Sequence, residues 1–153
     1  MRKTYDLLGV RLAILAGAVE TGGRYDLIEG IFPSGAETPL HRHTRYQEQI
    51  YVLEGEFTVR AEGRAVVLRP GDTFIIPAGM PHSVAATGGG RSLSRGLTIA
   101  SPSGFARFIE LAGTPADGLA GPAAPPDFAI LGRALAEVGD EILEPPGAER
   151  AGG

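Results

Sequence analysis

Apolar residues along the first hundred positions occur in short runs, with turn residues between them at intervals of roughly ten. The runs are rich in β-branched and aromatic side chains, and most of the 23 glycines and 12 prolines lie outside them. This pattern predicts an all-β barrel or sandwich. The strands that we expect lie at 10–16, 24–32, 38–43, 49–53, 57–61, 65–68, 73–76, 82–86 and 92–100.

The apolar spacing becomes helical after about residue 103. One predicted helix has Ser103 as its N-cap, Gly113 as its stop, and one apolar stripe made of Phe105, Phe108, Ile109 and Ala112. A second is capped by Asp127 and ends at Gly139, with a stripe made of Phe128, Leu131, Leu135 and Val138. We expect a loop at 114–126 and a frayed end from 145.

Length and charge limit the classes of protein that need to be considered. The 153 residues suit one domain, with a barrel core at about 10–100 and a helical extension at about 103–146. A net charge of −4 without a basic block argues against nucleic acid or an anionic membrane as partner. The short apolar run at 12–19 indicates a first strand rather than a secretory signal, so a cytoplasmic protein is expected.

All three histidines lie in two glycine-bounded segments. His41 and His43 are two positions apart, so on a strand both side chains project from one face, and His82 lies in the segment 71–82. Since the chain has no cysteine, a metal would bind through nitrogen and oxygen atoms. Three imidazoles with a nearby carboxylate suit a divalent transition metal.

Glu48 is the carboxylate best placed to join the histidines. It alternates with Ile50 and Val52, so all three point to the barrel interior, whereas Gln47, the competing ligand, has the opposite phase. Tyr46 is interpreted as a packing residue.

The spacing of these residues resembles the two sequence motifs of the cupin family. The first, G-x5-H-x-H-x4-E-x6-G, is filled by Gly35, His41, His43, Glu48 and Gly55. The second, G-x5-P-x-G-x2-H, is filled by Gly71, Pro77, Gly79 and His82, although Ala86 stands where an asparagine is usual. The fifteen residues between the motifs, the stretch 21–30 and the tail also resemble small single-domain bacterial cupins described as quercetin-dioxygenase-like.

This resemblance implies a double-stranded β-helix, the cupin jelly-roll barrel, with one or two short C-terminal helices. It also implies one divalent ion, held by His41, His43, Glu48 and His82. Iron(II) is the first expectation, and manganese, nickel, cobalt or zinc would also suit. Protons compete with the ion for the imidazoles, so we expect metal loading to fall steeply as the pH drops through about 6. A homodimer is expected, since cupins of this size commonly pair.

The cavity around the ion should be mainly apolar. Its expected lining is Ile50, Val52, Phe74, Ile76, Val84, Leu97 and Ile99. Arg95 alternates in phase with Leu97; it either anchors an anion inside the barrel or, the commoner arrangement, faces water at a strand end. Such a cavity suits a small aromatic or polyketide-like molecule.

The leading functional hypothesis is a metal-dependent dioxygenase of an enol or phenolic substrate, in which Glu48 also takes the substrate's proton, as the resemblance implies. The alternatives are an O2-independent isomerase, cyclase or lyase, and a non-catalytic cupin that binds a small molecule.

Overall fold

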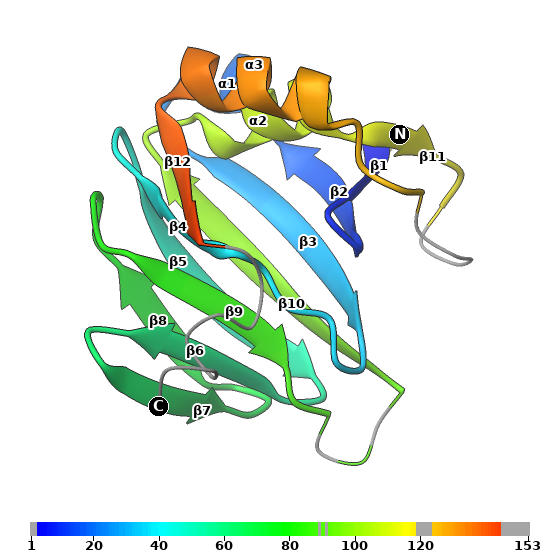
Figure 1. The fold of residues 1–153 in the computed structure, drawn as a ribbon, viewed down its shortest axis with the longest axis vertical. Helices are drawn as coiled ribbons and strands as arrows, with labels where there is room; N and C mark the ends of the chain where they lie inside the picture. Colours follow the sequence, from blue (N-terminus) through cyan, green and yellow to red (C-terminus); the bar gives the residue numbers. More distant parts are fainter. Residues whose placement is uncertain (1–2, 89, 91, 119–123, 145–153) are drawn as a thin grey trace.

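Two antiparallel sheets face each other in the computed structural model, which describes residues 3–88, 90, 92–118 and 124–144 (Figure 1). The seven-stranded sheet contains, in spatial order, β11 (Thr114–Ala116), β1 (Lys3–Leu7), β2 (Val10–Ala16), β3 (Asp26–Pro33), β10 (Leu93–Ser101), β5 (Gln47–Glu54) and β8 (Thr73–Ile76). The five-stranded sheet contains β12 (Asp140–Glu144), β4 (Leu40–His43), β9 (His82–Ala86), β6 (Phe57–Ala61) and β7 (Arg64–Leu68). The all-β prediction and the double-stranded β-helix are thereby confirmed.

Three helices lie together over one end of the barrel: α1 (Ala18–Thr21), α2 (Phe105–Ala112) and α3 (Phe128–Val138) (Figure 1). Both predicted C-terminal helices are present, and α3 begins as expected, because the Asp127 carboxylate accepts hydrogen bonds from the backbone N–H groups of Ala129 and Ile130. Of its predicted apolar stripe, Phe128 is instead exposed to solvent. Within the described ranges, no helix is both long enough and apolar enough to cross a lipid bilayer.

The N-terminus of α2 is capped by a strand of the sheet and not by the predicted Ser103. The Asp26 carboxylate, fully buried at the start of β3, accepts hydrogen bonds from the backbone N–H groups of Gly104 and Ala106. The Ser103 hydroxyl donates to the Tyr25 carbonyl instead. A long-range carboxylate therefore satisfies the helix end and ties α2 to the barrel.

The sequence analysis missed three strands. β1 precedes the expected first strand, β11 pairs with β1 inside the expected loop at 114–126, and β12 pairs with β4. A short helix, α1, lies in the connection between the strands expected at 10–16 and 24–32. The segment beyond 103 therefore also extends both sheets. Residues 119–123 of the expected loop, and the end expected to fray from 145, lie outside the described residues.

Two hairpins turn through a pair of residues with positive φ. The hairpin of β6 and β7 uses Glu62 (φ 53°) and Gly63 (φ 72°), and that of β1 and β2 uses Leu8 (φ 50°) and Gly9 (φ 82°). Left-handed backbone at two successive residues matches the twist of a two-residue hairpin and favours asparagine or glycine. A leucine at such a position is uncommon.

The core consists of two apolar clusters. One joins strands β1, β2 and β3 to helices α2 and α3, and includes Leu12, Ile28, Phe108 and Leu131. The other lies between the two sheets, at the end of the barrel away from the helices, and comprises Ile50, Val52, Phe57, Val59, Leu68, Ile76 and Val84. Residues of both clusters line the same cavity, so the site described below lies between them.

Candidate metal centre

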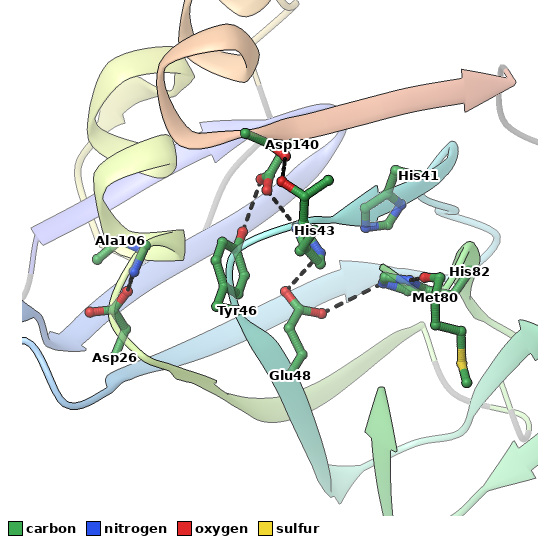
Figure 2. A network of polar contacts seen from close by, with 12 residues as sticks. Asp26, His41, His43, Tyr46, Glu48, Met80, His82, Ala106 and Asp140 are labelled. Atoms are coloured by element: carbon green, nitrogen blue, oxygen red, sulfur yellow. Dashed lines mark hydrogen bonds and ion pairs between the residues drawn. The ribbon is translucent and has the colours of Figure 1, made fainter. Parts of the chain in front are cut away.

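The structure brings the three histidines together inside the barrel. His41 and His43 come from β4, and His82 begins β9 as the direct cross-strand partner of His41. One ring nitrogen of each lies within 4.8 Å of those of the other two. His43 and His82 are buried and His41 is partly buried. Figure 2 shows the three rings from close by.

Backbone carbonyls orient two of the three rings. Nδ1 of His41 lies 2.6 Å from the Pro39 carbonyl oxygen, and Nδ1 of His82 lies 2.9 Å from that of Met80. A carbonyl only accepts, so each Nδ1 carries the hydrogen and each Nε2 keeps a free lone pair. Nε2 of His82 and of His43 are buried with no partner in hydrogen-bond geometry among the described residues. Buried nitrogen atoms left in this state fit a metal ion.

Glu48 closes the group from the facing sheet. Its Oε1 lies 3.1 Å from Nε2 of His43, and its Oε2 lies 3.7 Å from Nε2 of His82. The side chain is on β5 and buried, with 6% exposed, whereas Gln47 is exposed. The structure therefore places Glu48, and not Gln47, beside the histidines, as the strand phase predicts.

A second carboxylate, that of Asp140, approaches His43 from the opposite side. Its Oδ1 lies 3.0 Å from Nδ1 of His43, and its Oδ2 accepts a hydrogen bond of 2.9 Å from the Tyr46 hydroxyl. The Tyr46 ring stacks on the His43 imidazole, with centroids 4.6 Å apart. Asp140 was not among the expected site residues, because no periodic pattern marks one acidic residue after a helix stop. Tyr46, which was expected only to pack, also holds the Asp140 carboxylate.

The electrostatic environment shifts the pKa values of His41 and His43 in opposite directions. Burial, with the neighbouring His82 and His43, lowers the pKa of His41 to about 3. Burial also lowers the pKa of His43, but Glu48 and Asp140 outweigh it and raise that pKa to about 10. Burial raises the pKa of Glu48, but His43 and His82 outweigh it and hold the value well below the usual range. The side chains alone thus favour a neutral His41 and an ion pair between His43 and Glu48.

An apolar cavity of about 110 Å³ opens onto His41, His43 and Glu48. Of the lining expected from the sequence, Ile50, Val84 and Leu97 take part. The helices and the first hairpin supply residues that were not expected: Leu7, Leu8, Val10, Leu12, Phe105, Phe108 and Leu135. The helical end of the molecule therefore forms part of the cavity wall.

Five residues expected to line the cavity do not do so: Val52, Phe74, Ile76, Arg95 and Ile99. The first three pack into the cluster at the far end of the barrel because the space between the sheets is filled there. Arg95 contacts Glu29 at 3.1 Å and Glu54 at 3.3 Å, so two carboxylates hold its guanidinium away from the cavity. On the same strand, Gly96 and Thr98 line the cavity instead.

Comparison with known proteins agrees with this arrangement. Residues 29–94 match the family described as Cupin domain. Quercetin 2,3-dioxygenase of Bacillus subtilis is 28% identical over 105 residues, which cover 69% of this chain and 30% of that protein. An uncharacterized protein of Methanocaldococcus jannaschii is 34% identical over 67 residues, which cover 44% of this chain and 54% of that protein. The chain thus spans about half of one curated relative and less than a third of the other.

Among solved structures, the polyketide cyclase RemF from Streptomyces resistomycificus is similar, with a TM-score of 0.54 and 28% identity over 62% of this chain and 66% of that one. The family match, the curated relative and the fold together support the cupin superfamily for this chain.

Proposed function

We propose that this protein is a metal-dependent enzyme acting on a small, largely apolar molecule with an enol or phenolic hydroxyl, and that the reaction is a dioxygenation. One observation carries the proposal: three imidazoles cluster beside a buried carboxylate, and His41, His43 and Glu48 of this group line the wall of an apolar cavity. The likeness to a quercetin 2,3-dioxygenase supports the choice of dioxygenation.

His41, His43, His82 and Glu48 would hold one divalent transition metal, with iron(II) as the first choice. When bound, such an ion supplies Lewis-acid polarisation of a substrate oxygen and, as iron(II), redox chemistry with O2. The Nε2 atoms of His43 and His82 are buried and have no hydrogen-bond partner among the described residues, which indicates that these side chains fit an ion.

Glu48 is the residue that we assign to proton transfer. Because its pKa lies well below the usual range, the carboxylate is ionised at neutral pH, which is the form that accepts a proton. The low pKa also makes it a weak base, so the substrate hydroxyl would have to be made more acidic by the bound ion. The apolar lining excludes water and strengthens the electrostatic interaction between this carboxylate and the substrate. Ile50 and Val84, on facing strands, would pack against the two faces of a flat ring.

An O2-independent isomerisation or cyclisation is the second candidate. The likeness to a polyketide cyclase favours it. So does the pair of carboxylates, Glu48 and Asp140, on either side of His43, since proton transfers within such a group need no oxidant.

The metal site is tested first by elemental analysis of protein purified without chelators. We expect close to one transition-metal ion per chain, and its loss in His41→Ala and His82→Ala. Well-folded wild-type protein without metal would contradict the site. Light scattering on the same samples, at micromolar concentration, tests the homodimer, which stays a prediction.

The reaction is then tested with a panel of enols and phenols, by O2 uptake in air and product formation under argon. Uptake that depends on substrate supports the dioxygenase, and turnover under argon supports the second candidate. Glu48→Gln keeps the shape of the side chain but removes the base, so we expect a large loss of turnover. Gln47→Glu, on the exposed face of the same strand, is the matched control and should change little.

A further inference from the structure

The surroundings of His43 differ from those of the other two histidines. His41 and His82 direct Nδ1 at backbone carbonyls two residues away in the sequence. His43 directs Nδ1 at a side chain, the carboxylate of Asp140. This residue lies in the C-terminal segment, outside residues 29–94, which match the cupin family.

Strand pairing explains how Asp140 reaches the centre. β12 pairs with β4, and the register places Asp140 directly opposite His43. The side chain is buried, with 5% exposed. The preceding residue, Gly139, ends helix α3 with a left-handed φ of 78°, which turns the chain from the helix into the strand.

Tyr46 holds the other oxygen of Asp140. Its hydroxyl donates to Oδ2 at 2.9 Å, while its ring, nearly parallel to the His43 imidazole at 24°, covers one face of that ring (Figure 2). The contact between Nδ1 of His43 and Oδ1 of Asp140 is 3.0 Å long but falls outside hydrogen-bond geometry. The Tyr46 hydroxyl therefore fixes the orientation of the Asp140 carboxylate, which the contact with His43 does not fix on its own.

We infer that Asp140 and Tyr46 are positioning residues, which hold the His43 imidazole with Nε2 directed at His41, His82 and Glu48. The inference rests on the proposed metal site. A neutral imidazole that binds an ion through Nε2 keeps its hydrogen on Nδ1, and a carboxylate opposite Nδ1 favours that tautomer. Stacking by Tyr46 prevents the ring from tilting out of this orientation.

The test uses Co²⁺ as the probe and compares substitutions on the same strand. Asp140→Asn removes the buried charge, and Glu141→Gln is the matched control, since Glu141 is the next residue, is exposed, and pairs with Arg42 at 2.7 Å. Tyr46→Phe keeps the stacked ring and removes only the hydroxyl. Dissociation constants come from titration, and the d–d absorption band of the saturated protein reports the geometry around the ion.

Because Asp140 also helps to keep a proton on His43, the dissociation constants are measured at several pH values and corrected for that proton. With this correction, we expect Asp140→Asn to weaken Co²⁺ binding about 10- to 100-fold, as for other residues that orient a metal-ligating histidine. Tyr46→Phe should weaken it several-fold, and Glu141→Gln less than twofold. The d–d band should shift in Asp140→Asn even at saturation, which a purely structural role would not cause. Thermal melting without cobalt checks that each variant folds.

If Asp140→Asn binds Co²⁺ with wild-type affinity and an unchanged d–d band, the inference is overturned. It is also overturned if Glu141→Gln loses as much affinity as Asp140→Asn, because that would indicate a general effect of charge. If Asp140→Asn fails to fold, the result for Tyr46→Phe is used instead, and wild-type affinity with an unchanged band in that variant overturns the inference. A wild-type protein that binds no cobalt would overturn the proposed metal site as well, so the two failures are distinguishable.

Discussion

The proton on His43 should determine how metal affinity depends on pH. With its pKa raised to about 10, this imidazole carries a proton at neutral pH, and an ion that binds Nε2 must displace it. At pH 7 the solution is about three pH units below that pKa, and each unit is worth about 1.4 kcal/mol. Binding at pH 7 is therefore weaker by about 4 kcal/mol than binding to a neutral His43. His41, with its pKa of about 3, has no proton to lose in this range.

The expected result is a dissociation constant for Co²⁺ that falls about tenfold per pH unit between about pH 7 and 9, with one proton released per ion. This differs from the steep loss below about pH 6 that ordinary histidine pKa values predict from the sequence. Competition titrations against a chromophoric chelator measure the slope. An affinity that is constant over this range would refute the reasoning, because His43 would then already be neutral.

Three other predictions follow from the same structure. Metal-free protein should melt at a lower temperature as the pH rises from about 7 to 10. The reason is that the pKa of His43 is raised to about 10 from an unfolded value near 6.5, so the stability it contributes is fully present below about 6.5 and is lost as the pH rises through about 10. A melting temperature that rises over this range would contradict this. Gly104→Ala should lower the melting temperature and displace Tyr46, since a Cβ there would lie 2.7 Å from the Tyr46 ring. Gly132→Ala, on α3, has open space for the added Cβ and should increase the free energy of unfolding by up to about 1 kcal/mol. Thermal melting of the two variants tests both expectations. Glu62→Asn should raise the melting temperature by a few degrees, because asparagine tolerates the left-handed backbone of this turn better than glutamate does. Leu8→Asn relieves the same backbone conformation but removes an apolar side chain from the cavity wall, so it should lower the melting temperature. Equal gains in the two variants would show that the Leu8 side chain contributes nothing.

Much of the barrel could be predicted from the sequence because its signals are local. Turn residues mark the ends of the strands, and the alternation of Glu48 with Ile50 correctly assigns their face of β5. The strands expected at 57–61 and 65–68 are β6 and β7, which pair as a hairpin through Glu62 and Gly63. The three histidines could be assigned to one site because the expected barrel pairs their strands, and His41 on β4 is the cross-strand partner of His82 on β9.

The features that were missed depend on contacts between distant segments. Asp140 enters the site only because β12 pairs with β4, and no pattern near residue 140 indicates that partner. Asp26 caps α2 from another part of the chain, so Ser103, the local candidate, was preferred wrongly. On β10, Gly96 lines the cavity, and a Cβ there would lie 3.1 Å from the Tyr51 carbonyl oxygen and 3.4 Å from the Phe57 ring. Apolar periodicity does not indicate a position where space is this limited.

The hydrogen bond between Tyr46 and Asp140 joins residues that are 94 positions apart in the chain. Closing a loop of that length costs about 4 kcal/mol of chain entropy beyond a constant, which must be repaid by contacts that form together with it. The contact should therefore form late in folding, after the strands between the two residues have assembled. Any ion that the histidines hold would then be taken up by the finished barrel, and its capture would report that folding is complete.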